Sequence, residues 1–273
     1  MKLLGLDLDG TLLRPDQTVA PEDRQAIIRA QQAGVVVTIV TGRLLGSAVR
    51  VAKDVGLVGP LVCADGGLVA HTSGEVLVRS PLPLAEVTHA ARVAEAQGLG
   101  AFTMLDDEIH YDARATEHAR YASGWSSNLT AQARLLGSPA IGPHTLGLIA
   151  FGPQQAIDRA REQVHQHCPN LETLVFGLAK GDWALKLTPR AVDKGTGVAH
   201  LARQLGVAQA DVAVIGDWHN DVPMLKWAGH SFAMGQALDE VKAHARHVLT
   251  ATSATGGGVA EVVQKLLGRA PHL

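Results

Sequence analysis

The feature that most constrains this chain is a series of short apolar runs, each ending in polar residues and each followed by a helical pattern. Residues 2–6 and 35–40 are two of these runs, and residues 212–215 form a third near the other end of the sequence. Runs of this length, rich in Leu, Val and Ile, are typical of strands buried on both faces of a parallel sheet. The pattern therefore predicts an α/β domain.

The helix expected between the first two strands supports the same fold class. Pro21 can open this helix, and Gly34 is placed to end it. The order of strand, helix and strand is the unit from which a Rossmann-like parallel sheet is built. Residues 61–64 are expected to form a third strand of this kind.

The middle of the chain has a different character. Pro81 and Pro83 interrupt regular structure and suit a linker. The residues that follow favour helices at 85–97 and 154–167 and a short helix around 115–123, among several strands spaced for antiparallel pairing. Towards the C-terminus the first pattern returns. We therefore expect two domains: an α/β core of residues 1–82 and 187–273, and an inserted α+β domain of residues 83–186.

Composition narrows the kinds of partner. With 24 Lys and Arg residues against 26 Asp and Glu residues, the formal net charge is -2, so no general field attracts nucleic acid or an anionic membrane. We expect a small soluble ligand, no nucleic acid, no membrane, and a monomer or homodimer. Cys63 and Cys168 lie in apolar surroundings, as buried thiols do. We expect no leader or membrane-spanning segment. The expected location is the cytoplasm.

Polar residues follow three of the expected core strands. In open α/β sheets ligands bind at the carboxyl ends of the strands, so these groups can meet in one site. The first strand is followed by two aspartates two residues apart, which face the same way if the chain stays extended. The polar residues gathered in this way are Asp7, Asp9, Thr41, Arg43, Asp217, Asn220 and Asp221.

Carboxylates gathered at one edge need a positive partner, because like charges at close range cannot all stay ionised in a partly buried site. A set made only of oxygen ligands, with room for water and substrate, suits Mg²⁺ better than zinc. Lys194 adds a positive charge and Thr41 a hydroxyl donor. Gly10 and Gly42 would let backbone N–H groups approach an anion closely. The implied ligand is a phosphoryl group.

Each of these residues also has an ordinary structural interpretation. An aspartate at a strand end, such as Asp7, is often only a turn residue, and Thr41 and Asn220 could be helix caps. Lys194 could be an exposed lysine at a helix start, and Arg43 could form a surface ion pair. The recurrence of polar residues at several strand ends favours the site.

Four segments of the chain carry a resemblance to a known family. They are Asp7-Leu8-Asp9-Gly10-Thr11, Val40-Thr41-Gly42-Arg43, Lys194-Gly195 and Gly216-Asp217-Trp218-His219-Asn220-Asp221. In these segments the chain resembles phosphatases of the haloacid dehalogenase (HAD) superfamily, of the Cof-like type with a C2-type cap. The resemblance implies a catalytic core interrupted by a cap domain that sets substrate specificity.

The resemblance also implies a role for each motif. Asp7 would attack phosphorus to form an aspartyl-phosphate, while Asp9 would protonate the leaving oxygen and then activate water. Mg²⁺ would be held by Asp7, Asp9 and Asp217. The phosphoryl group would be bound by Asp7, Thr41, Gly42, Lys194 and Asn220, with Lys194 also catalytic and with Arg43 and Asp221 in support.

The position of the insert narrows the substrate class. One loop and one helix fill the chain between Asp9 and Thr41, so no cap fits there, and the insert instead follows the third strand, as in similar sugar-phosphate phosphatases. We expect hydrolysis of a small phosphorylated metabolite, with a sugar phosphate as the leading candidate. Two alternatives stay open: a phosphotransferase similar to the phosphomannomutases, and a non-catalytic phospho-ligand sensor.

Three residues depart from the pattern that the resemblance leads us to expect. Trp218 stands where relatives more often carry a small residue, Asp65 where many carry Asn, and Gln236 where Asn is usual. These differences affect the loops around the site and leave the nucleophile and the metal set unchanged. In the insert, candidates for substrate contact are Asp106, His110, Tyr111, Asp182, Trp183 and Lys186, each of which could also be an ordinary strand-surface residue.

Overall fold

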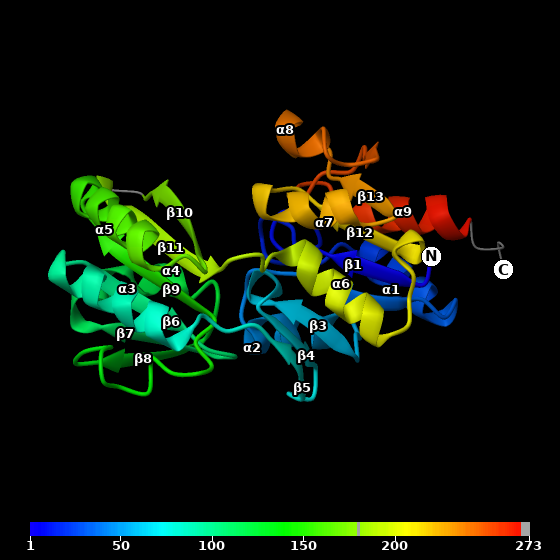
Figure 1. The fold of residues 1–273 in the computed structure, drawn as a ribbon. Coiled ribbons are helices and arrows are strands. Elements are labelled where there is room, and N and C mark those ends of the chain that lie inside the picture. Colours follow the sequence, from blue (N-terminus) through cyan, green and yellow to red (C-terminus); the bar gives the residue numbers. More distant parts are fainter. Residues whose placement is uncertain (179–180, 269–273) are drawn as a thin grey trace. The chain divides into compact units, whose positions relative to one another are not determined.

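The computed structural model describes residues 1–178 and 181–268, which form two compact units (Figure 1). The first unit combines residues 1–42, 48–78 and the chain from 193 onward, and the second combines 43–47 with 79–192. The α/β class with a parallel sheet is confirmed, whereas the domain limits given above stay a prediction. No helix within the described residues is long and apolar enough to cross a membrane.

The first unit is built on a parallel sheet of five strands in the order β14-β13-β12-β1-β2. Strand β1 lies between β2 and β12, and its residue Leu3 is paired with both Val36 and Val212. The beginning and the end of the sequence therefore share one sheet. The strands are β1 (Leu3–Leu6), β2 (Val36–Ile39), β12 (Val212–Gly216), β13 (His230–Ala233) and β14 (His247–Val248).

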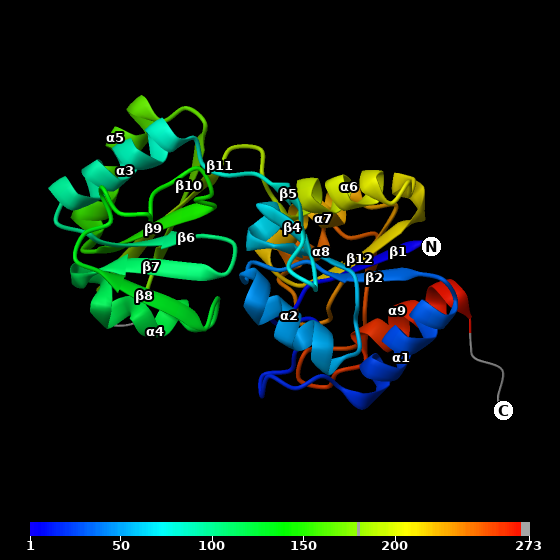
Figure 2. The same cartoon turned by 90° about the horizontal axis from the view of Figure 1, so that it is seen from below.

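Helices cover both faces of this sheet (Figure 2). On one side lie α1 (Pro21–Gln32) and α9 (Gly258–Leu267), and on the other lie α6 (Lys194–Gln204) and α7 (Val222–Trp227). Because both faces are covered, side chains on either side of β1 are buried, which explains why the strand is an unbroken apolar run. Further helices are α2 (Leu45–Asp54) and α8 (Asp239–Lys242).

The third expected strand does not join the parallel sheet. Instead β3 (Pro60–Cys63) pairs antiparallel with β4 (Leu68–His71), in a separate sheet that also contains β5 (Val76–Arg79). It meets the end of β2 through a parallel bridge between Val40 and Val62. An apolar run this short predicts burial but not which sheet a strand enters.

The second unit contains a six-stranded sheet in the order β10-β11-β9-β6-β7-β8, antiparallel except for the pair of β7 and β8. Strand β8 is not evident from the sequence, because three of its five residues are polar and none is buried. Helices α3 (Leu84–Ala96) and α5 (Gln154–His167) cover one face, and α4 (Ala119–Ala122) is a single turn. The strands are β6 (Gly100–Met104), β7 (Glu108–Asp112), β8 (Asn128–Gln132), β9 (Gly147–Gly152), β10 (Leu171–Gly177) and β11 (Trp183–Pro189).

Asp23, in the first turn of α1, fixes the start of α9. Its carboxylate accepts hydrogen bonds from the N–H groups of Gly257 at 2.8 Å and Ala260 at 3.0 Å. The first N–H groups of a helix have no partner within the helix, so this buried carboxylate serves as a cap supplied from the other end of the sequence.

We expect Asp23→Ala to destabilise the first unit by about 1–3 kcal/mol, because it leaves two partly buried N–H groups without their acceptor. The free energy of unfolding in urea measures this loss, and hydrogen exchange at Gly257 and Ala260 localises it. The control is Glu22→Ala, which removes an exposed carboxylate one residue away and should cost less than about 0.5 kcal/mol. Equal effects of the two substitutions would contradict the capping role.

Candidate active site

Asp7 lies at the carboxyl end of β1, where the strand turns into a tight loop. The loop is closed by a hydrogen bond from Leu12 N–H to Asp7 O at 3.2 Å. Gly10 in this loop has a φ of 86°, and a side chain there would collide with the carboxylate of Asp217. The glycine is therefore required both by the backbone conformation and by the close approach of Asp217.

Lys194, the first residue of α6, places a buried positive charge between two buried carboxylates. Its Nζ donates to Asp7 Oδ1 and to Asp221 Oδ1, each at 2.6 Å. Burial alone would lower the pKa of Lys194, but the charges of Asp7 and Asp221 outweigh that effect and raise the pKa. The lysine is held charged.

Asp221 has both carboxylate oxygens engaged. Its Oδ1 accepts from Lys194, and its Oδ2 accepts from the N–H groups of Asp217 at 2.8 Å and Trp218 at 2.9 Å. By contrast, Asp7 Oδ2 accepts no hydrogen bond from the described residues. Asp221 therefore orients the surrounding groups, while Asp7 keeps one oxygen available for a ligand.

Asp217 is held by two side chains. Its Oδ1 accepts from the hydroxyl of Thr11 at 3.1 Å, and its Oδ2 accepts from Gln236 Nε2 at 3.2 Å. Burial, followed by the negative charge of Asp221, raises the pKa of Asp217. The same two causes raise the pKa of Asp7 well above its usual range. One lysine does not offset the repulsion among these carboxylates.

The three carboxylates fit a hard divalent cation. Asp7, Asp217 and Asp221 offer oxygen atoms that lie within 4.8 Å of one another. Asp221 is fully buried and is bound by a charged lysine and two backbone N–H groups, whereas Asp217 accepts from two neutral side chains, so Asp7 and Asp217 are the carboxylates better placed to hold an ion. A cation between them would relieve the repulsion that raises both pKa values, and an oxygen-only set suits Mg²⁺.

Asp65 connects three other positions of the expected phosphate site. Its N–H donates to Thr41 O at 3.0 Å, and its Oδ1 accepts from Asn220 Nδ2 at 2.9 Å. A side chain at Gly42 would come within 3.0 Å of the same oxygen. The structure therefore brings Thr41, Gly42 and Asn220 together around Asp65.

The two remaining expected residues, Asp9 and Arg43, differ in how far they are exposed. Asp9 is exposed, as an acid or base that exchanges protons with substrate and water must be. Arg43 is half-buried and falls in the second unit, so its supporting role stays a prediction.

Thr11, Asp65 and Gln236 belong to the site but are not identified by sequence reasoning. Asp65 and Gln236 stand out in the sequence only as departures from a pattern. Gln236 Nε2 also donates to Gly10 O at 2.6 Å, so it joins the loop that follows β1 to Asp217. The signal that could identify them is their position, since each follows a strand of the first unit.

Two of the candidates for substrate contact, Asp106 and His110, have hydrogen-bonding partners within the second unit. Asp106 Oδ1 accepts from Arg79 Nε at 2.9 Å. His110 lies between Glu108 and Gln132, with one ring nitrogen 2.9 Å from each. These contacts do not test a role in substrate binding, which stays a prediction.

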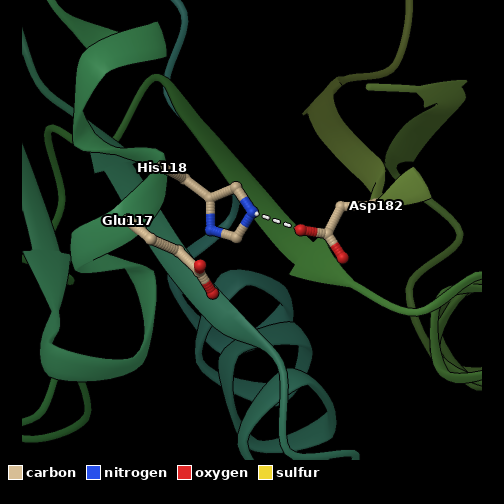
Figure 3. A group of neighbouring side chains, drawn as sticks. All are labelled: Glu117, His118 and Asp182. Carbon is tan, nitrogen blue, oxygen red and sulfur yellow. Dashed lines mark hydrogen bonds and ion pairs between the residues drawn. The ribbon is translucent and has the colours of Figure 1, made fainter. Parts of the chain in front are cut away.

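A second group of ligand-type side chains lies in the second unit (Figure 3). It consists of Glu117, His118 and Asp182, whose ligand atoms lie within 4.8 Å of one another. His118 Nε2 is 3.2 Å from Asp182 Oδ2, and its ring stacks on Phe151 with the centroids 4.7 Å apart. An imidazole with carboxylates suits a borderline ion such as zinc, so the oxygen-only set of the first unit is the better Mg²⁺ candidate.

Comparison with known proteins identifies the family. A family model described as haloacid dehalogenase-like hydrolase matches residues 4–263. The 5-amino-6-(5-phospho-D-ribitylamino)uracil phosphatase YwtE of Bacillus subtilis is 27% identical over 98% of each chain. The HMP-PP phosphatase of Serratia proteamaculans is 29% identical over 100% of this chain and 97% of that one. The pyridoxal phosphate phosphatase YbhA of Escherichia coli is 27% identical over 91% and 93%.

Solved structures share the fold along nearly the whole chain. A haloacid dehalogenase-like hydrolase from Bacteroides thetaiotaomicron has a TM-score of 0.82 at 24% identity, covering 97% of this chain and 99% of that one. A similar hydrolase from B. subtilis has a TM-score of 0.79 at 22% identity, covering 97% and 100%. Since the family model spans almost all of the sequence, the chain belongs to the haloacid dehalogenase-like hydrolases and is an enzyme of the phosphatase type that its four motifs predict.

Proposed function

We propose that this chain is a Mg²⁺-dependent phosphomonoesterase that hydrolyses a small phosphorylated metabolite through an aspartyl-phosphate on Asp7. The observation that carries the proposal is the state of the Asp7 carboxylate. It is buried, Lys194 holds one oxygen, and the other oxygen accepts nothing from the described residues. A carboxylate fixed in this way can attack phosphorus without first breaking a hydrogen bond at the attacking oxygen.

In the proposed reaction Asp7 Oδ2 bonds to phosphorus as the bond to the leaving oxygen breaks. Asp9 gives the leaving oxygen a proton, and then takes a proton from the water that splits the aspartyl-phosphate. The products are an alcohol and inorganic phosphate, and both carboxylates return to their first state. The groups proposed to hold the phosphoryl group are Thr41, Gly42, Lys194 and Asn220, with Arg43 and Asp221 in support.

The proposed Mg²⁺ ligands are Asp7, Asp9 and Asp217. When bound, the ion would screen the repulsion between the Asp7 carboxylate and a phosphate dianion. The oxygen-only donor set and the raised pKa values of Asp7 and Asp217 support this assignment. Lys194 lowers the pKa of Asp7 against the raising effect of burial, and Asp221 keeps Lys194 in place.

Two classes of substrate fit the proposal. The position of the insert favours a sugar phosphate, whereas two relatives are named for phosphates of a uracil derivative and of pyridoxal. A first screen should therefore contain both classes. Cys63 and Cys168, both within the described residues, are buried and are not joined in a disulfide, which supports a reducing compartment such as the cytoplasm.

Two other functions make different predictions for the same site. A phosphotransferase similar to the phosphomannomutases would convert a hexose bisphosphate into isomerised monophosphate faster than it releases phosphate. A non-catalytic sensor would keep phosphate on Asp7 for hours. The exposed Asp9 carboxylate two residues from Asp7 opposes the sensor, because a sensor needs no proton donor for a leaving group.

We expect Asp7→Asn to lower Mg²⁺-dependent phosphate release at least about a thousandfold, because the amide cannot act as the nucleophile. Release of inorganic phosphate from sugar phosphates, pyridoxal 5′-phosphate and a chromogenic ester measures the effect. Asp158→Asn makes the same chemical change at an exposed position of α5 and should leave turnover unchanged. Wild-type turnover by Asp7→Asn would rule out the mechanism.

We expect Mg²⁺ to bind more weakly as the pH falls, and this loss should begin above the range in which an ordinary aspartate takes up a proton. The raised pKa values of Asp7 and Asp217 mean that protons compete with the ion at these higher pH values. Without Mg²⁺, the folded state binds these protons more tightly than the unfolded chain, so this contribution to stability is lost as the pH rises.

Profiles of kcat/KM against pH at low and at saturating Mg²⁺ test this competition. Saturating Mg²⁺ should move the acid limb to lower pH. Thermal unfolding should show a larger rise in Tm on adding Mg²⁺ at neutral pH than at about pH 5. An acid limb that does not respond to Mg²⁺ would show that protons and the ion do not share these carboxylates.

A further inference from the structure

Trp218 is a residue of the fourth motif that the proposed chemistry leaves unused. It follows Asp217 directly, and its N–H donates to Asp221 Oδ2 at 2.9 Å. The other oxygen of Asp221 accepts from Lys194, which also donates to Asp7. Three hydrogen-bonded links therefore connect the backbone of Trp218 with the proposed nucleophile, and they fix where this residue lies.

Trp218 is exposed although the acidic residues Asp217 and Asp221 of the same motif are buried. The residue is 55% exposed, against 8% for Asp217 and 0% for Asp221. Among the Phe, Tyr and Trp residues, all of which lie in the described part of the chain, Trp218 alone is exposed. A ring of this size gains much by burial, so leaving it in water gives up a large stabilising contribution. The loop presents this aromatic surface beside the acidic site.

His219 supports the indole without enclosing it. The two ring centroids are 5.3 Å apart and the ring planes are at 75°, so the imidazole can cover at most one face of the indole. His219 Nε2 lies 3.2 Å from Glu240 in α8, which holds the imidazole from its other side. At least one face of the indole is left uncovered by this neighbour.

We propose that Trp218 is a stacking surface that selects phosphate monoesters with a flat aromatic or heteroaromatic ring in the leaving group. This inference rests on the proposed function, because it takes the phosphoryl group to be bound at Asp7. A flat ring can stack on the indole over most of its face, whereas a saturated ring presents a puckered surface of C–H groups. Trp218 then determines specificity, and Asp7 and Asp9 carry the chemical step.

The test compares benzyl phosphate with cyclohexylmethyl phosphate, which have the same charge and similar size and differ in the flatness of the ring. We expect the wild type to favour benzyl phosphate in kcat/KM by about fivefold, Trp218→Leu to remove that preference, and Trp218→Phe to keep most of it. The control is Trp227→Phe, a half-buried tryptophan at the end of α7, which should leave the ratio unchanged.

Binding to the Asp7→Asn variant gives a readout that does not depend on turnover. Calorimetric titration with the two esters in the presence of Mg²⁺ should show tighter binding of benzyl phosphate, and the double variant Asp7→Asn/Trp218→Leu should lose the difference. Equal affinities, no binding of either ester, or a preference that survives Trp218→Leu would overturn the stacking surface and leave the phosphatase proposal standing. Ring-dependent binding without turnover of any ester by the wild type would instead contradict the proposed function alone.

Discussion

The buried ammonium group of Lys194 is the interaction on which the rest of the site depends. It lies 2.6 Å from a carboxylate oxygen of Asp7 and 2.6 Å from one of Asp221, and all three residues are buried. A buried charge that loses its partner costs several kcal/mol, so removing the lysine would leave two buried carboxyl groups without their positive partner. Because Asp221 also binds the N–H groups of Asp217 and Trp218, one positive charge sets the positions of the proposed nucleophile, the second proposed metal ligand and the exposed indole together.

The parallel sheet could be predicted because burial on both faces leaves a clear trace in sequence. Strands β1, β2 and β12 are short runs of apolar residues that stop where polar residues begin, and these stops mark the edge where the site lies. Asp7 and Asp221 could be proposed as neighbours for the same reason, whereas Lys194, at the start of a helix, could be proposed only as the positive charge that the carboxylates need. Which carboxylate oxygen binds which donor could not be predicted, because that depends on distances of a few tenths of an ångström between segments far apart in the chain.

Other features leave no such trace. Strand β8 is largely polar and has no buried residue, so its apolar content does not distinguish it from a loop. Strand β3 has the composition of a core strand, yet its antiparallel pairing with β4 takes it into another sheet. Asp65 and Gln236 act through hydrogen bonds to residues more than 150 positions away, and a single sequence does not show such pairings.

The pairing of β1 with β12 has a consequence for the order in which the protein is made. During synthesis β1 leaves the ribosome long before residues 212–216 exist, so its partner on one side is missing until most of the chain has been translated. Residues 79–192 are continuous and contain their own sheet and apolar core. They can therefore fold before β12 is available to pair with β1. The acidic site needs Asp7, Lys194 and Asp221 together, so it can be completed only after all of residues 79–192 have been translated.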